Sequence, residues 1–245
     1  SGAGNGGNVA IRFATEGYHT VLCRRNDEGG LNKMVAEIEA GGGSASGYLL
    51  NAVEPDALEE RIADVEANIG PIDAVVFNLG AQIGDRSLAN TSYKAFEIGW
   101  RMATFALFRM ASVVTPFMQE RGRGTILVTS ATSAVRGNAG QHSHAAAMGG
   151  RRMLCQSLNA EFAPKGIHVA HIVIDGAVDA PDTLGKMLGE EKFQALREAK
   201  GMEHDGLMLP ERIADTYYHI HQQHRSVWTH EMDLRSFSDR AWWNH

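Results

Sequence analysis

The sequence has little cysteine and no long apolar run. Its two cysteines, Cys23 and Cys155, both lie inside apolar segments, where a thiol usually behaves as a small buried hydrophobic group. This usage favours a reducing, cytoplasmic location. No apolar run approaches the roughly 18 residues of a membrane span, and no signal pattern opens the chain. We therefore expect no membrane partner.

Basic charge is also scarce. The chain has 23 Lys and Arg against 29 Asp and Glu, which gives a formal net charge of −6. A nucleic-acid-binding face needs basic side chains to neutralise phosphates, so we expect no nucleic-acid partner. Arg151 and Arg152 form a close basic pair, and we interpret them as part of a solvated helix face.

Repeats, low-complexity segments and Pro- or Ser-rich linkers are absent, which favours a single domain over residues 1–245. Short β-branched runs alternate with segments whose apolar residues recur at three- and four-residue spacing. The expected strands are 19–23, 47–50, 72–77, 124–130 and 168–174, and the expected helices are 28–41, 56–69, 92–119, 145–163 and 211–223. The alternation predicts an α/β fold with a Rossmann-like, doubly wound parallel sheet flanked by helices.

The polar, helix-prone region 179–209 follows the last of these strands. An insertion after the carboxyl end of a strand lies over the ligand crevice in this class of fold, so the region is interpreted as a lid-like insertion. A surface helix pair without a ligand role is the alternative.

The chain opens on the glycine-rich segment SGAGNGG. Glycines let a backbone approach a pyrophosphate closely, and the free N–H groups of the following helix favour the anion. We expect Gly2, Gly4, Asn5 and Gly6 to contact a nucleotide, although a plain turn explains the glycines as well. Such a turn normally follows a strand, so we expect the natural protein to have a first strand before Ser1.

Two later features favour a nucleotide. Arg24 and Arg25 follow an expected strand, about eighteen residues beyond Gly6, where the residue that recognises the adenosine ribose normally lies. Arginine suits a 2′-phosphate and hence NADP, and the alternative is a solvated basic turn. Asn78 and Gly80 follow the strand 72–77, at the sheet edge where open α/β sheets bind ligands.

These motifs resemble the short-chain dehydrogenase/reductases. The segment SGAGNGGN is similar to the family's Thr-Gly-x-x-x-Gly-x-Gly turn, and Phe77-Asn78-Leu79-Gly80 to its Asn-Asn-Ala-Gly motif. GRGTILVTS and EFAPKGIHVAHIVIDGAVDAP follow its later strands, with Asp175-Gly176 where Pro-Gly is usual. The resemblance extends along nearly the whole chain in order and spacing. It implies an NADP(H)-dependent oxidoreductase that forms a homodimer or homotetramer, with Gly176 at the cofactor and Arg24 selecting NADP; NAD or no cofactor are the alternatives.

The family's catalytic side chains are replaced at the matching positions. Its members use an asparagine, a serine, and a tyrosine and lysine four residues apart for acid–base work and oxyanion stabilisation beside the nicotinamide. By spacing, the asparagine position is Ala103, the serine position is Ala131, and the tyrosine and lysine positions are His144 and Met148. Whether the chain is an active enzyme is therefore open.

Three functional hypotheses follow. In the first, an oxidoreductase acting on an unknown carbonyl or alcohol uses His144 as proton donor and a hydroxyl of Ser130, Thr132 or Ser133 on the substrate oxygen. In the second, the chain is a catalytically inactive nucleotide-binding or scaffold homologue. In the third, it is a non-redox lyase or isomerase that uses His144.

The histidines near the C-terminus do not predict a metal site. In a helix, His221 and His224 share a face while His219 lies on another, and no cysteine or carboxylate stands at ligand spacing. Nearby Trp228, Trp242 and Trp243 fit either a subunit interface or packing within the chain.

Overall fold

The structure is a computed structural model that describes residues 4–80, 87–201 and 206–244. It divides into two compact units, and each is described by itself. Unit 1 comprises Ser1–Asn51, Asp175–Gln222 and Leu234–His245, and unit 2 comprises Ala52–Ile174 and Gln223–Asp233. Within the described residues, no helix is long and apolar enough to cross a membrane.

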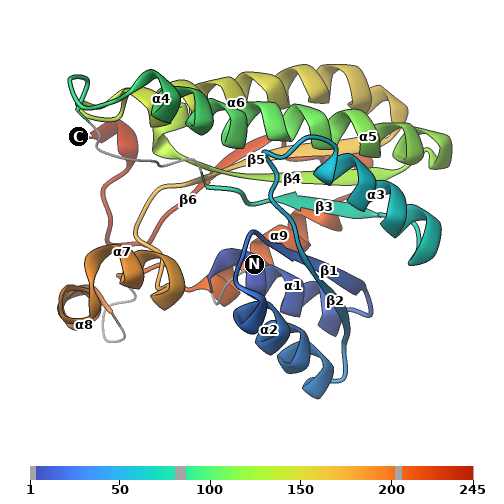
Figure 1. Cartoon of the computed structure of the whole chain (residues 1–245), viewed down its shortest axis with the longest axis horizontal. Helices are drawn as coiled ribbons and strands as arrows, with labels where there is room; N and C mark the ends of the chain where they lie inside the picture. Colours follow the sequence, from blue (N-terminus) through green and yellow to red (C-terminus); the bar gives the residue numbers. More distant parts are fainter. Residues whose placement is uncertain (1–3, 81–86, 202–205, 245) are drawn as a thin grey trace. The chain divides into compact units, whose positions relative to one another are not determined.

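Unit 1 contains a pair of parallel strands and the helices that pack on them (Figure 1). Its elements are α1 (Asn5–Thr15), β1 (His19–Arg24), α2 (Glu28–Ala40), β2 (Ser44–Leu49), η4 (Pro181–Gly185), α7 (Lys186–Leu188), α8 (Glu190–Lys200), α9 (Pro210–His221) and η6 (Trp242–Asn244). β1 pairs with β2 from His19 opposite Ser44 to Arg24 opposite Leu49. Its core contains Ala14, Leu22, Leu31, Met34, Ile38 and Ala45.

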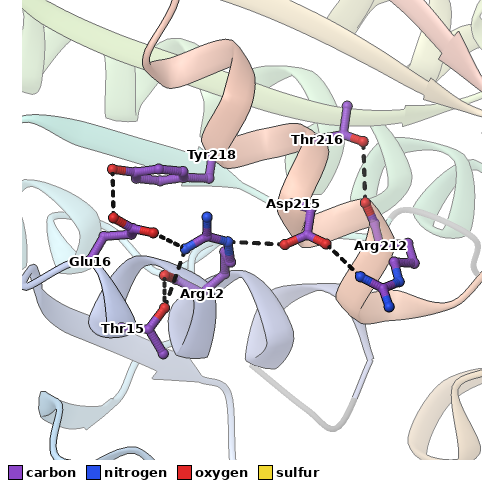
Figure 2. Close-up of polar contacts among 7 residues, drawn as sticks. All are labelled: Arg12, Thr15, Glu16, Arg212, Asp215, Thr216 and Tyr218. Carbon is purple, nitrogen blue, oxygen red and sulfur yellow. Dashed lines mark hydrogen bonds and ion pairs between the residues drawn. The ribbon is translucent and has the colours of Figure 1, made fainter.

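Helix α1 lies along α9, and Arg12 is the centre of the polar contacts between them (Figure 2). The Arg12 guanidinium donates to Asp215 at 3.0 Å, pairs with Glu16, and lies 4.4 Å from the centre of the Tyr218 ring. The buried Phe13 ring also contacts the Tyr218 ring edge-on, with 5.3 Å between the ring centroids. Ion pairs between exposed side chains contribute little to stability, so the buried Phe13 supplies the larger share of the stabilisation.

Unit 2 contains four strands in the order β3-β4-β5-β6, of which β6 ends at the unit boundary. Its elements are α3 (Ala57–Asn68), β3 (Ala74–Phe77), α4 (Tyr93–Trp100), η1 (Arg101–Phe105), α5 (Ala106–Arg121), β4 (Gly124–Ala131), η2 (Thr132–Ala134), α6 (His142–Phe162), η3 (Ala163–Lys165), β5 (Ile167–Ile174), η5 (Arg225–Val227) and β6 (Glu231–Leu234). Helices α4, α5 and α6 cover one face of this sheet (Figure 1). Strands β3, β4 and β5 are parallel, with Gly124 opposite Ile167.

The five expected strands and the expected α/β class are confirmed. β4 and β5 are buried along most of their length, which explains why their sequences are continuous apolar runs rather than alternating ones. The core of unit 2 includes Leu107, Met110, Val114, Ile126, Val128 and Val169. Strand β6 was not expected, because its sequence EMDL has two acidic residues and little β-propensity.

The expected helix over 92–119 is confirmed. It contains a π-helical segment, because α4 continues directly into η1 and η1 into α5. Pro116 lies well inside α5, beyond this π-helical segment.

His171 connects β5 to β6 through an acidic residue. Its fully buried Nδ1 lies 3.0 Å from Glu231, whose carboxylate also accepts two hydrogen bonds from Arg152, each 2.7 Å long. Burial lowers the pKa of His171 to about 4, although the charge of Glu231 acts in the opposite direction. The imidazole is therefore neutral near pH 7 and donates to Glu231.

This low pKa predicts that unit 2 loses stability in mild acid. Between pH 6.5 and pH 4 the unfolded chain protonates His171 while the folded chain does not, so the free energy of unfolding falls as pH falls. The loss approaches about 3 kcal/mol at pH 4. Urea unfolding of His171→Gln should show a flatter pH dependence in this window. An unchanged slope in His171→Gln would contradict this assignment, and exposed His142→Gln is the matched control.

Candidate active site

Two of the four positions that the resemblance assigns to catalytic side chains meet in the interior of unit 2. Ala103 of η1 and Met148 of α6 belong to one buried cluster with Ala134 and Ala147. The Ser130 hydroxyl, near the end of β4, lies 3.9 Å from the Met148 sulfur. Segments η1, β4 and α6 therefore meet where the resemblance implies the asparagine, serine and lysine. The side chains of the buried cluster at this place are apolar.

His144 lies in the first turn of α6, one turn before Met148. Residues four apart share a helix face, so the imidazole and the buried thioether point to the same side of α6. His144 is half-buried, with Nδ1 inside the protein. Its exposed portion gives this region an imidazole that a substrate could reach.

The three candidate hydroxyls differ in access. Ser130 and Ser133 are each 5% exposed, whereas Thr132 is half-buried. Among the described residues, the Ser133 hydroxyl has no hydrogen-bond partner. The geometry therefore favours Thr132 over Ser130 for contact with a ligand, because Ser130 faces Met148 in the core.

Arg151 is the largest fully buried side chain, and it bonds to three different segments of unit 2. It is 1% exposed. Its guanidinium donates to the carbonyl of Leu79 after β3 at 2.7 Å, of Thr129 in β4 at 2.6 Å, and of Ala103 in η1 at 3.1 Å. The Phe77 ring lies 5.0 Å from its central carbon. The interpretation of Arg151 as part of a solvated face is wrong, and only Arg152 is partly exposed.

The bond from Arg151 to Ala103 falls within the π-helical segment η1. Such single-turn π-helical segments inside α-helices are frequent at functional sites. Thr104 of the same segment donates to the Ala147 carbonyl of α6 at 2.8 Å. A Cβ at Gly150 would lie 2.9 Å from the Thr104 hydroxyl, so glycine permits this close approach.

Cys155, one turn after Arg151, is not a nucleophile. Burial raises the pKa of its thiol to about 12, although the positive charge of Arg151 acts in the opposite direction. The thiol is fully buried and stays protonated at neutral pH. The expectation of a buried, hydrophobic cysteine is confirmed at this position.

We predict that Arg151→Met lowers the free energy of unfolding by about 3 to 5 kcal/mol, because three buried carbonyls lose their donors. Arg151→Lys should lose less, since an ammonium can retain part of the bonding. Chemical denaturation measures both losses. If Arg151→Met left the free energy of unfolding nearly unchanged, the three hydrogen bonds would contribute little to stability. Arg152→Met, which removes a partly exposed ion pair, is the control.

The Asn78-Leu79-Gly80 motif follows β3 directly. Asn78 and Gly80 are exposed, while the carbonyl of Leu79 between them accepts from Arg151. The exposed side chain of Asn78 is thus available to a ligand at the carboxyl end of β3. The sequence did not reveal that Arg151 orders this motif, because a single arginine inside a helix carries no signal of burial.

The glycine-rich turn in unit 1 ends at Gly4, which precedes the first residue of α1. Gly4 is buried, and a Cβ there would lie 3.3 Å from the Ala180 Cβ. Among the described residues, the buried Asn5 Oδ1 has no hydrogen-bond partner. A glycine cradle at the N-terminus of an 11-residue helix suits a pyrophosphate. Gly6 lies in the first turn, and Gly2 is outside the described residues.

Arg24 and Arg25 have different surroundings. The Arg24 side chain, 11% exposed, pairs with Asp27 and lies 3.4 Å from Asp182. Arg25 is exposed. Asp27 also caps α2 by accepting the Gly30 N–H at 2.9 Å. The sequence predicted a cation at this position, but not the two carboxylates that surround it.

Asp175 and Gly176 contact the C-terminal segment of unit 1. The buried Asp175 carboxylate accepts from Arg235 Nε at 3.1 Å and from the Trp242 backbone N–H at 2.9 Å. Gly176 is exposed, and a Cβ there would lie 3.0 Å from an Asp239 oxygen. The backbone of Trp242 is therefore held by Asp175 within unit 1.

The comparisons with known proteins define the family. A model of the short chain dehydrogenases matches residues 1–186, and the chain belongs to that family. It is 29% identical over 219 residues to the short-chain reductase protein NovJ of Streptomyces niveus, covering 88% of this chain and 82% of that protein. It is also 25% identical over 216 residues to the 7alpha-hydroxysteroid dehydrogenase of Escherichia coli K12, covering 85% and 84%.

Solved structures confirm the Rossmann-like α/β fold. A short-chain dehydrogenase from Rhodopseudomonas palustris matches with a TM-score of 0.78 and 32% identity, covering 96% of each chain. A metagenomic short-chain oxidoreductase in complex with NADP matches with a TM-score of 0.76 over 95% of this chain and 92% of that one. The latter is 22% identical, so it bears on the fold alone.

Proposed function

We propose that this short-chain dehydrogenase binds NADP(H) and acts on an unidentified carbonyl or alcohol through a degenerate active site. The observation that carries the proposal is the glycine cradle at Gly4, before the N-terminus of α1, with the Arg24 guanidinium in the same unit. Gly4, Asn5 and Gly6 would hold the pyrophosphate, and Arg24 and Arg25 the 2′-phosphate.

The remaining assignments from the resemblance also belong to this proposal. Asn78, Gly80 and Gly176 would contact the cofactor, as would Gly2, which lies outside the described residues. We also retain residues 1–245 as one domain with 179–209 as a lid-like insertion, and a cytoplasmic location.

The chemistry would depend on few side chains of unit 2. A bound nicotinamide supplies or accepts the hydride. Because the Nδ1 of His144 is buried, Nε2 is the nitrogen that would exchange a proton with the substrate oxygen. The half-buried Thr132 hydroxyl would donate a hydrogen bond to that oxygen. Met148 cannot replace the ammonium of a lysine, so the proton donor would act without a neighbouring lysine cation.

A non-catalytic nucleotide-binding protein is the second candidate. The packing of Met148 and Ala103 into one apolar cluster favours it, because that cluster supplies no proton donor and no polar contact to a ribose. Both candidates require NADPH binding, and only the first requires hydride transfer.

We predict that NADPH binds in calorimetry and is oxidised with at least one member of a carbonyl panel. In His144→Phe, kcat should fall by about 10² or more, with little change in NADPH affinity. His142→Phe, an exposed histidine in the same helical turn, is the matched control and should retain full activity. Equal rates in His144→Phe and the wild type would remove the assigned role. Binding without oxidation would favour the non-catalytic candidate.

We further propose a homodimer or homotetramer built on unit 2. Aromatic side chains are exposed along α4, η1 and α5, where Trp100 stacks on Phe105 at 5.5 Å and Phe105 on Phe108 at 6.4 Å. Phe108 is 52% exposed. A row of exposed aromatic rings is typical of the apolar centre of a subunit interface.

Phe108→Glu should therefore dissociate the oligomer, because a charge would be desolvated at the centre of the interface. Sedimentation velocity should show a shift to the monomer, with unchanged secondary structure by circular dichroism. Phe237→Glu, at an exposed phenylalanine of unit 1, should leave the assembly intact. A wild-type protein that sediments as a monomer would refute the proposal.

A further inference from the structure

We propose that Asp182 is a specificity-determining residue that competes with the 2′-phosphate of a nucleotide for Arg24. This inference rests on the proposed NADP(H) binding and deepens it. It concerns unit 1 alone, where Arg24 ends β1 and Asp182 lies in η4, 158 residues later in the chain. Nothing in the sequence pattern connects these two residues, and the structure brings their charges together.

The two carboxylates at Arg24 are held differently. Asp27 is fixed by its second role, because its other oxygen caps α2 through the Gly30 N–H. A Cβ at residue 30 would overlap the Arg24 guanidinium, so glycine is what lets Arg24 lie over the start of α2. Asp182 makes the longer contact, 3.4 Å from Arg24 Nη2. Of the two, Asp182 is therefore the exchangeable partner.

Asp182 has a second partner within its own segment. Its other carboxylate oxygen lies 3.5 Å from the Lys186 ammonium, one helical turn further on. If Asp182 leaves Arg24, this contact keeps its charge paired. Moving Asp182 away from Arg24 therefore leaves its carboxylate paired with Lys186. The Asp182 side chain is 35% exposed, so water can also solvate the carboxylate.

A nucleotide 2′-phosphate is a stronger ligand for Arg24 than Asp182 is. A phosphate monoester carries about −1.5 to −2 charges at pH 7 and three acceptor oxygens, against one charge on a carboxylate. Arginine matches such groups with paired hydrogen bonds. A 2′-hydroxyl, as in NAD(H), has no charge with which to displace Asp182. Removal of the Asp182 charge should thus change the affinity for NADPH more than the affinity for NADH.

Calorimetry with four probes tests the inference: NADPH, NADH, 2′,5′-ADP and 5′-AMP. In Asp182→Asn, we expect NADPH and 2′,5′-ADP to bind about three- to fivefold more tightly, in line with the loss of a partly exposed competing ion pair. NADH and 5′-AMP should change less than about twofold. In Arg24→Met, the preference for the 2′-phosphate should fall by about tenfold or more.

The matched control is Glu190→Gln. It removes one negative charge from an exposed position at the start of α8, in the same lid-like insertion, at a residue other than the two carboxylates that pair with Arg24. It should leave all four affinities within about twofold of the wild type, which separates local competition from a change in overall charge.

The outcomes distinguish the two proposals. Equal effects of Asp182→Asn on phosphorylated and unphosphorylated probes, or no effect, would overturn the role of Asp182 while leaving nucleotide binding intact. Loss of the preference in Arg25→Met but not in Arg24→Met would also overturn it, because the exposed Arg25 would then hold the phosphate. Failure of all four probes to bind the wild type would instead refute the proposed function, and this inference with it.

Discussion

The buried guanidinium of Arg151 is the interaction on which the interior of unit 2 depends. A charged side chain is stable in a protein interior only if its donors are satisfied, and here three backbone carbonyls satisfy them. These carbonyls belong to the segment after β3, to β4 and to η1. One side chain of α6 therefore fixes three separate parts of the region where the family's catalytic groups lie.

The packing around Arg151 explains how the region remains ordered without those groups. Met148 fills the lysine position with an apolar side chain, and Ala103 offers a backbone carbonyl to Arg151 where the resemblance implies an amide side chain. The cation of this region is Arg151, which is buried and donates to three backbone carbonyls. The backbone of this region therefore stays ordered around Arg151. Of the four positions that the resemblance assigns to catalytic side chains, His144 is the one with a partly exposed acid–base group.

Unit 1 holds the residues on which the proposed nucleotide binding depends. They are Gly4 before the N-terminus of α1 and the Arg24 guanidinium, groups of the kind that suit a phosphate. A protein of this kind can retain nucleotide affinity while its catalytic chemistry changes or disappears, which is why binding and turnover must be measured separately.

Much of the fold could be predicted from sequence because β4 and β5 are continuous apolar runs and the helices have clear periodicity. The four positions assigned by counting along family motifs stay a prediction; the structure adds that Ala103 and Met148 belong to one buried cluster. The burial of Arg151 and the partnership of Arg24 with Asp182 could not be predicted, since both depend on contacts between distant segments. A prediction from hydrophobic periodicity places every arginine on the surface, so it could not find a buried one. Strand β6 was missed because its pairing with β5, rather than its own composition, makes it a strand.

The most direct test of the account is the hydrogen exchange of arginine Nε–H groups, followed by NMR. The account predicts that the Arg151 Nε–H, bonded to the Ala103 carbonyl, exchanges only when unit 2 unfolds. The exposed Arg25 should exchange rapidly in the same sample. An Arg151 signal that exchanges as fast as that of Arg25 would contradict the claim that this side chain is a buried structural cation.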